Sequence, residues 1–192
     1  MRKIIASEFV TLDGVMESPG EPEELGGRGG WANPLINEEM EKYKYDELLA
    51  SEALLMGRIT YDLLAASWPN MTDETGFAER MNLLPKYVVG SSLGIDPWKN
   101  SKLIEGDIGK EVALLKQLPG QNILVPGSGQ LLRTLLQHNL VDELRLMVFP
   151  VVLGTGKRLF QDVSDMSVFK HAETKTFNNG VVVLVYQFEG AS

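Results

Sequence analysis

Two short segments of this chain each read as an apolar strand that ends in glycine and passes directly into a helix. They are Leu-Leu-Met-Gly-Arg-Ile-Thr-Tyr at 54–61 and Ile-Leu-Val-Pro-Gly-Ser-Gly-Gln-Leu-Leu at 123–132. The first N–H groups of such a helix have no partner within the helix and point beyond the end of the strand. Two such junctions predict two anchor points for a ligand that carries phosphate groups, so a dinucleotide is the first candidate.

The composition is that of an ordinary globular protein and argues against several other functions. The 192 residues, of which 44% are hydrophobic and 23% charged, suit a single domain spanning 1–192. A net charge of -8 without any basic run argues against nucleic acid as a partner. The chain has no cysteine, and His138 and His171 have no spacing partner, so we expect no metal. Because no segment resembles a signal peptide or a membrane span, we expect a cytoplasmic protein with no membrane partner.

The hydrophobic pattern predicts strands that alternate with helices up to about residue 150, followed by strands alone. Residues 15–34 are rich in glycine and proline and predict a long loop, a kind of segment that is usually functional. Asn178-Asn179-Gly180 is a strong hairpin signal. This order predicts an α/β fold, with a mostly parallel sheet and an antiparallel C-terminal hairpin at its edge. The predicted strands are 3–10, 52–56, 86–90, 102–104, 122–125, 142–152, 168–177 and 181–188, and the predicted helices are 37–50, 59–66, 73–82, 107–117 and 129–137.

The first junction offers three groups that suit a phosphate. Gly57 allows a close approach to the backbone, Arg58 supplies a cation, and Thr60 supplies a hydroxyl in the first helical turn. A glycine turn with a surface arginine is an equal alternative, because such turns are common. The second junction is the stronger signal, since two glycines bracket Ser128 directly after a buried strand. No third glycine completes the G-x-G-x-x-G pattern, which disfavours an ordinary Rossmann site.

Four further residues are weaker candidates. Ser91 and Ser92 follow a predicted strand and could bind a phosphate or ribose, although serines there are often only turn residues. Asp13 could orient a substrate or relay a proton, and the alternative is an Asp-Gly turn. Trp31 is either a flat lid over a heteroaromatic ring or a loop anchor packed on the core.

Taken in order, these segments resemble the dihydrofolate reductase-like superfamily. The closer likeness is to the reductase domain of the bacterial riboflavin-biosynthesis deaminase-reductase, the RibD C-terminal domain, and to its stand-alone relatives. The matching pieces run from residue 9 to residue 156. They are Phe9-Val10-Thr11-Leu12-Asp13-Gly14, Gly30-Trp31, Leu55-Met56-Gly57-Arg58-Ile59-Thr60-Tyr61, Val125-Pro126-Gly127-Ser128-Gly129-Gln130-Leu131, Leu140-Val141-Asp142-Glu143-Leu144 and Pro150-Val151-Val152-Leu153-Gly154-Thr155-Gly156.

The resemblance implies a three-layer dihydrofolate reductase-like fold and NADPH as the cofactor. It also implies hydride transfer to a pterin-like or pyrimidine-like ring, and a homodimer. The likeness assigns Gly57, Arg58 and Thr60 to the adenosine-side phosphates, and Ser91 and Ser92 to the 2′-phosphate region. It assigns Gly127, Ser128, Gly129 and Gln130 to the pyrophosphate, with Leu131 next to them. Ala6, Val15 and Met16 are assigned to the nicotinamide.

Two departures from the riboflavin reductases concern the substrate. Those enzymes typically have a glutamate just before the second glycine pair, where this chain has Pro126. They also have an aspartate pair shortly after the threonine of the first junction, which the segment 61–69 lacks. The cofactor half of the site therefore matches better than the substrate half, which we expect to be built from 15–34 and 37–50.

Three functions remain open from the sequence. The leading one is an NADPH-dependent reductase acting on a small pterin-like, pyrimidine-like or carbonyl substrate, with Asp13 orienting the substrate and Trp31 covering its ring. The second is a catalytically silent protein that binds NADPH or another nucleotide. The third is a structural α/β domain whose glycine turns are coincidental.

Overall fold

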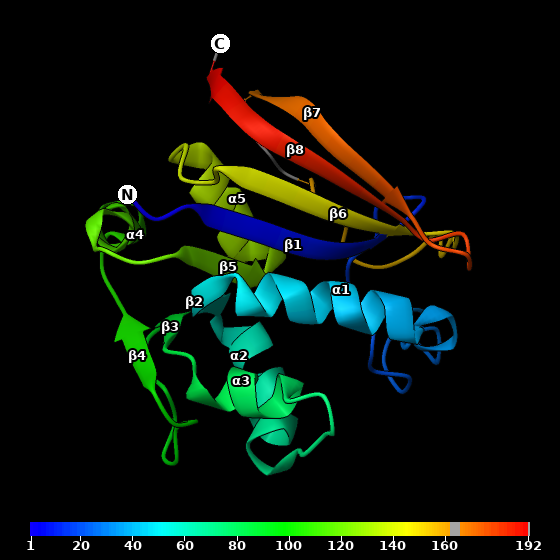
Figure 1. The fold of residues 1–192 in the computed structure, drawn as a ribbon, viewed down its shortest axis with the longest axis horizontal. Coiled ribbons are helices and arrows are strands. Elements are labelled where there is room, and N and C mark those ends of the chain that lie inside the picture. Colours follow the sequence, from blue (N-terminus) through cyan, green and yellow to red (C-terminus); the bar gives the residue numbers. More distant parts are fainter. Residues whose placement is uncertain (162–165, 192) are drawn as a thin grey trace.

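The fold is built on one continuous sheet. The computed structural model describes residues 1–161 and 166–191. Its strands are β1 (Ile4–Thr11), β2 (Ser51–Gly57), β3 (Lys86–Val89), β4 (Ser101–Ile104), β5 (Asn122–Pro126), β6 (Glu143–Phe149), β7 (Ser167–Thr176) and β8 (Val182–Ala191). In space they follow the order β4-β3-β2-β5-β1-β6-β8-β7, with β4 at the lower left and the β7–β8 hairpin at the top of Figure 1. The first six strands are parallel and β8 is antiparallel to β6 and β7, so the predicted sheet and hairpin are confirmed.

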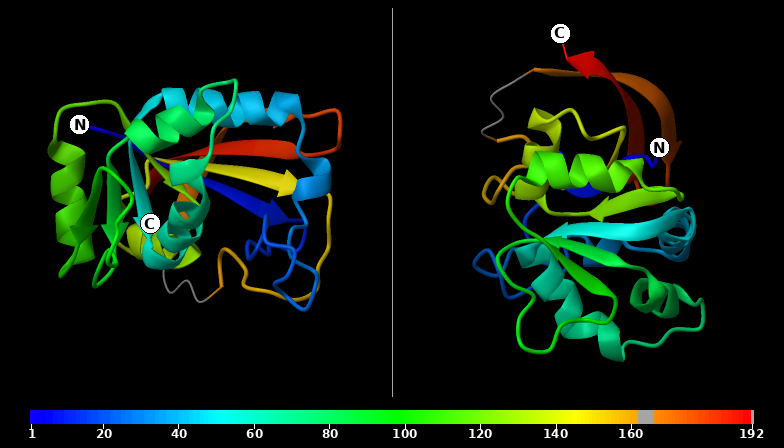
Figure 2. Two further views of the ribbon diagram at one scale, coloured as in Figure 1. Left: turned by 90° about the horizontal axis from the view of Figure 1, so that it is seen from below. Right: turned by 90° about the vertical axis from the view of Figure 1, so that its left-hand side faces the viewer.

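Helices cover both faces of the sheet. They are α1 (Glu38–Leu49), α2 (Arg58–Ser67), α3 (Phe77–Leu83), α4 (Ile108–Gln117) and α5 (Gly129–Gln137), with short 3-10 helices η1 (Asn33–Leu35) and η2 (Trp68–Asn70). Val112 of α4 and Leu132 of α5 are buried in the core of one face, and Leu48 of α1 and Met81 of α3 in the core of the other. Figure 2 shows these layers from two further sides, and the three-layer fold is confirmed. Among the described residues, no helix is long and apolar enough to span a membrane.

Two predicted elements are longer than the observed ones by more than two residues. The strand predicted at 142–152 ends at Phe149, because Pro150 has no N–H to donate to a neighbouring strand. The helix predicted at 73–82 begins only at Phe77, since Gly76 has a left-handed φ of +85°. Asp73 lies before this helix, where its carboxylate accepts the N–H of Phe77 at 3.0 Å.

The sheet order creates a crevice between β2 and β5. From β2 the chain passes through α2 to β3, on one side of β2, whereas from β5 it passes through α5 to β6, on the opposite side. The two connections diverge, and parallel α/β sheets bind ligands at the carboxyl ends of strands that diverge in this way. Both predicted junctions therefore lie at this crevice.

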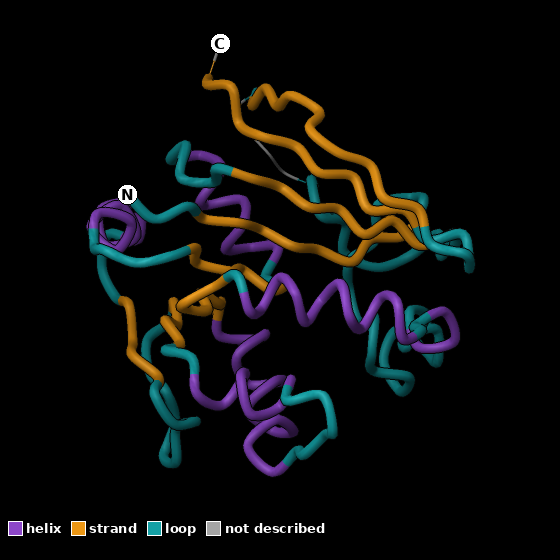
Figure 3. Tube along the Cα trace, viewed as in Figure 1, coloured by secondary structure: helices purple, strands orange, loops and turns teal. Residues whose placement is uncertain are grey.

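The long loop between β1 and α1 forms the rim of the crevice. It spans 12–37 and holds no regular element beyond η1, as Figure 3 shows by its colour. Val15 makes an isolated β-bridge with Arg158, and the N–H of Met16 donates to the carbonyl oxygen of Lys157 at 3.0 Å. The loop that follows β6 thus holds the first loop in place.

Candidate active site

A cleft of about 1770 Å³ opens at the divergence of β2 and β5. The carboxyl ends of β1, β2 and β5 and the first turns of α2 and α5 contribute to it, together with α1 and the two rim loops. Both segments predicted to form the substrate pocket, 15–34 and 37–50, contribute lining residues. Pro126, where the riboflavin reductases have a glutamate, also lines the cleft.

The two strand–glycine–helix junctions are in direct contact. Ser128 Oγ accepts the backbone N–H of Gly57 at 2.9 Å and donates to Thr60 Oγ1 at 2.7 Å. To make these contacts, Ser128 has a left-handed φ of +78°, which side chains other than glycine rarely adopt. One serine therefore joins the beginnings of α2 and α5 into a single surface.

Neither helix is capped by a side chain at its beginning. Gly57, the N-cap of α2, has no side chain, and the side chain of Ser128, the N-cap of α5, does not bond to the first turn of α5. The N–H groups of both first turns therefore face the cleft without a cap, which favours an anion there. Gly129 also leaves room for Met16, whose Sδ would lie 2.3 Å from a Cβ at that position.

Two arginines lie beside this surface, and they differ in how their side chains are held. The Nε of Arg58 donates to Asp62 Oδ1 at 2.8 Å, and its Nη1 donates to Ser92 Oγ at 2.9 Å. Arg133 lies four residues into α5, and its Nη1 is 3.9 Å from the position of a Cβ on Gly129. Within 1–161 and 166–191, no hydrogen bond or ion pair holds Arg133. Its spacing from Gly129, one helical turn, is the sequence signal that could have identified it.

The other predicted cofactor residues are divided between the cleft and its surroundings. Gly127, Gln130 and Leu131 line the cleft, as do the residues named above: Met16, Gly57, Arg58, Thr60, Ser128 and Gly129. Ala6 and Val15 are buried in the core next to it and are not lining residues. Ser91 and Ser92 are exposed and lie outside the lining, and Ser92 is linked to the site through Arg58.

Asp13 is bound into the rim rather than aimed into the cleft. Its carboxylate accepts the hydroxyl of Thr11 at 2.7 Å and the backbone N–H groups of Leu153 and Gly154 at 3.2 and 2.8 Å. The Thr11 hydroxyl and the Gly154 N–H lower the pKa of this carboxyl to about 2. Asp13 is not a lining residue. This geometry favours the alternative that the sequence left open, a turn residue, over a catalytic role.

Trp31 is also placed as an anchor of the loop. Its Nε1 donates to the carbonyl oxygen of Glu17 at 2.9 Å, and its ring meets that of Phe149 edge-on with centroids 5.3 Å apart. The side chain is buried in the core near α1 and is not a lining residue. The geometry favours the anchor over the lid.

Glu8 is a further lining residue that the sequence did not predict. It lies on β1 and is only 1% exposed, yet both of its carboxylate oxygens are buried without a hydrogen-bond partner among the described residues. Burial raises the pKa of this carboxyl to about 8, and the positive charge of Lys44 opposes the rise. The available signal was a glutamate within the apolar run of the first predicted strand, since glutamate is almost never fully buried unless it is paired.

The comparison with protein families agrees with this geometry. The model of the RibD C-terminal domain family matches residues 2–183. The chain belongs to the RibD C-terminal domain family. This RibD C-terminal domain is 35% identical over 193 residues to YyaP, an uncharacterised protein of Bacillus subtilis, with 98% of the chain and 96% of YyaP covered.

Solved structures show the same fold. A protein described as a putative riboflavin biosynthesis protein, from Shewanella sp. PV-4, has a TM-score of 0.74 at 19% identity, with 99% of this chain and 100% of that one covered. The dihydrofolate reductase of Enterococcus faecalis, in complex with NADP(H) and RAB-propyl, has a TM-score of 0.60 at 13% identity, with 98% and 97% covered. The dihydrofolate reductase-like fold of this RibD C-terminal domain is thereby confirmed.

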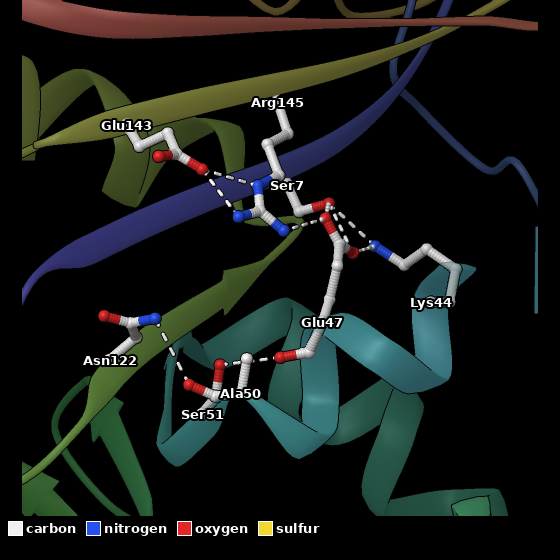
Figure 4. A network of polar contacts seen from close by, with 8 residues as sticks. All are labelled: Ser7, Lys44, Glu47, Ala50, Ser51, Asn122, Glu143 and Arg145. Atoms are coloured by element: carbon white, nitrogen blue, oxygen red, sulfur yellow. Dashed lines mark hydrogen bonds and ion pairs between the residues drawn. The ribbon is translucent and has the colours of Figure 1, made fainter. Parts of the chain in front are cut away.

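On the α1 side of β1, this RibD C-terminal domain has a buried network that the sequence did not indicate. Figure 4 shows Glu47 reaching from α1 towards Ser7 on β1, between Lys44 and Arg145. Ser7 Oγ donates to both carboxylate oxygens of Glu47 at 3.0 Å, and Arg145 Nη1 lies 3.1 Å from Glu47 Oε1. Arg145 also pairs with Glu143 at 2.6 Å. The network holds α1 against the sheet beside the cleft, and its two carboxylates are balanced by two cations.

Proposed function

We propose that this protein is an NADPH-dependent reductase that transfers a hydride to a small pterin-like, pyrimidine-like or carbonyl substrate. The observation that carries the proposal is the meeting of two uncapped helix beginnings at the crevice, joined through Ser128. Such a surface suits the linked phosphates of a dinucleotide, because each helix offers free N–H groups to one anionic group. The NADP(H) complex of the dihydrofolate reductase with the same fold supports this choice of ligand.

The residues at the crevice fit the phosphates of NADPH. Arg133 holds its cation over the beginning of α5, where the partial positive charge of the helix makes a cation unfavourable unless an anion is present. A phosphate bound between Arg133 and the first turn of α5 would remove that repulsion. Arg58, fixed by Asp62 and Ser92, would meet a second phosphate from the α2 side.

When bound, NADPH supplies the hydride, and this chain supplies the binding and the orientation. The beginnings of α2 and α5 would hold the phosphates, and Met16 would cover the beginning of α5 and limit the access of water. The α1 side of the cleft, held by the Glu47 network, leaves room for a ring next to the end of β1.

Calorimetric titration with NADPH and NADH tests the cofactor. We expect Arg133→Met to weaken NADPH binding about tenfold or more, as a lost charge-assisted hydrogen bond does. We expect Arg58→Met to do the same. Lys170→Met, on the exposed β7 strand, is the matched control and should change nothing. A protein with no affinity for NADPH, or unchanged affinity in both Arg133→Met and Arg58→Met, contradicts the assignment.

Turnover separates an enzyme from a binding protein. Oxidation of NADPH, followed by the loss of its absorbance, would be measured with a panel of pterins, pyrimidinones, quinones and small carbonyl compounds. Tight binding without oxidation on any of them favours the catalytically silent nucleotide-binding protein. The homodimer stays a prediction, which light scattering in solution would test.

A further inference from the structure

Glu8 lies at the point where the sheet opens into the cleft. The last residue of β5, Pro126, is paired with Ser7, and the N–H of Gly127 reaches the carbonyl oxygen of Ser7 at 3.4 Å. Glu8 is the next residue of β1, so it lies one position beyond the end of β5, while β6 still pairs with it on the other side through Leu146. Successive side chains of a strand point to opposite faces. Glu8 therefore shares a face with Ala6 and not with Ser7 and the Glu47 network.

The described residues do not satisfy the hydrogen-bonding capacity of the Glu8 carboxyl group. Buried polar atoms are nearly always hydrogen-bonded, and an exception requires an explanation. Both carboxyl oxygens of Glu8 lack a partner among the residues that the structure describes, although Glu8 lines a large cleft. No group of three or more metal-binding side chains exists in the part of the chain that the structure describes, so a metal does not explain them. A molecule that enters the cleft would supply the missing partners.

The protonated form of the Glu8 carboxyl group determines which ligand group can form hydrogen bonds with it. A carboxylic acid offers one O–H donor and one carbonyl acceptor, side by side. Its complement is a group with an acceptor and a donor in the same arrangement, which an amide with adjacent C=O and N–H provides. A phosphate has only acceptors and would leave the carbonyl oxygen of Glu8 facing an anion. An amide satisfies both oxygens without adding charge to a buried site.

We propose that Glu8 binds, as a neutral carboxylic acid, the amide group of a ligand through a pair of hydrogen bonds. The amide is either the carboxamide of a nicotinamide or the ring lactam of a pyrimidinone or pterin. Which of these molecules enters the cleft rests on the proposed function. Besides Glu8, the charged side chains that line the cleft are Glu17, Glu21, Glu24, Lys157 and Arg158 from the rim loops, Glu38, Glu41, Lys42 and Lys44 from α1, Arg58 from α2, Asp73 before α3, and Arg133 from α5. Lys44 opposes the protonation of Glu8, and burial outweighs it.

Two variants and two pairs of ligands test the proposal. Glu8→Gln keeps a donor and an acceptor in the same shape, whereas Glu8→Leu removes both. NADPH is compared with 2′-phospho-ADP-ribose, which lacks the nicotinamide, and uracil is compared with 1,3-dimethyluracil, which lacks the N–H groups. Affinities would be measured by calorimetry for the nucleotides and by ligand-observed NMR for the uracils, at a series of pH values.

We expect Glu8→Leu to weaken the amide-bearing ligand about tenfold or more and to leave its amide-free partner unchanged. Glu8→Gln should stay within about threefold of the wild type. Wild-type affinity should fall as the pH rises past about 8, where Glu8 loses its proton, and the affinity of Glu8→Gln should not depend on pH in that range. If Glu8→Leu weakens the binding of NADPH alone, the amide that Glu8 binds is the carboxamide of the nicotinamide. If it weakens the binding of uracil alone, that amide is the lactam of the substrate ring.

Three results overturn the proposal. The first is an unchanged affinity of Glu8→Leu for every ligand. The second is an equal loss of affinity for the amide-free ligands in Glu8→Leu. The third is a loss of affinity in Glu8→Gln as large as that in Glu8→Leu. A wild-type protein that binds neither nucleotide contradicts the proposed function alone, and the uracil pair then decides the role of Glu8. Thermal unfolding of both variants shows whether each is folded.

Discussion

Two buried glutamates lie close to β1 and have opposite environments. Glu47 is 3% exposed and bonds to Ser7, Lys44 and Arg145, whereas Glu8 is 1% exposed and bonds to no described residue. The first is held by partners that the chain itself supplies, so it stabilises the position of α1. The second is left to a molecule from outside. Burial alone therefore does not single out a carboxyl group for a ligand, and it is the lack of partners that distinguishes Glu8 from Glu47.

The two sites also differ in electrostatic cost. In the Glu47 network, two carboxylates face two cations, and the attraction offsets the cost of removing the charges from water. At Glu8 the single cation, Lys44, is too weak to offset burial, and the carboxyl group stays protonated. Stability should therefore depend on pH through Glu8 and on ion pairing through Glu47.

The largest expected effect is the pH dependence that Glu8 imposes. Its pKa is about 8 in the folded protein against 4.5 for an ordinary glutamate, so between these values the unfolded chain loses its proton first. The contribution of Glu8 to the free energy of unfolding should be highest below about pH 4.5, decline as the pH rises, and level off above about pH 8. At about 1.4 kcal/mol for each unit, the decline is on the order of 5 kcal/mol.

Urea unfolding of the wild type and Glu8→Gln at a series of pH values measures this decline. The glutamine has no proton to lose, so the difference between the two proteins isolates Glu8 from every other titrating group. If the free energy of unfolding depends on pH in the same way for the two proteins from about pH 5 to about pH 9, Glu8 is not held neutral. The contrast between Glu8 and Glu47 would then be wrong.

Removing Glu47 should give the next largest effect. Glu47→Leu leaves Lys44 and Arg145 beside a buried surface without their shared anion, and we expect a loss of about 3 kcal/mol in the free energy of unfolding. Glu47→Gln keeps an acceptor for Ser7 and should lose less. The exposed Lys42–Asp46 pair on the same helix is the control, and Asp46→Asn should cost about 0.5 kcal/mol or less. Equal losses for Glu47→Leu and Asp46→Asn would contradict a stabilising role for the network.

The contrast between these sites also explains what the sequence could predict. The glycine junctions are local signals, because a glycine and the helix that follows it are neighbours in the chain, and α5 has the predicted bounds of 129–137. The Glu47 network joins residues that are 40 and 98 positions apart. The isolation of Glu8 depends on where β5 ends, which is a property of the assembled sheet. No local pattern encodes the Glu47 network, and the glutamate within the apolar run of the first strand indicates that Glu8 is unusual without showing that it lacks partners.

For Asp13 and Trp31, the sequence indicated a candidate residue but could not separate a functional role from a structural one. The sequence offered two interpretations for each, because an Asp-Gly turn and a tryptophan in a glycine-rich loop fit both function and structure. The partners in the folded protein favour the structural interpretation of each: Asp13 bonds to Leu153 and Gly154, and Trp31 bonds to Glu17. These contacts cross between loops that are far apart in the sequence or turn back within one loop.

Lys44 links the two glutamates, and its removal should give the smallest effect of the three. Its side chain is 20% exposed, donates to Ser7 Oγ at 2.7 Å, pairs with Glu47 and lowers the pKa of Glu8. We expect Lys44→Met, which keeps much of the apolar stem, to cost about 1 kcal/mol in the free energy of unfolding. The same change should raise the pKa of Glu8 further, because the opposing charge is gone. The decline of stability should then continue to a higher pH than in the wild type, and unfolding measured between about pH 7 and about pH 10 reads this shift. If the decline ends at the same pH as in the wild type, the charge of Lys44 does not affect the pKa of Glu8, and the two glutamates are independent of each other.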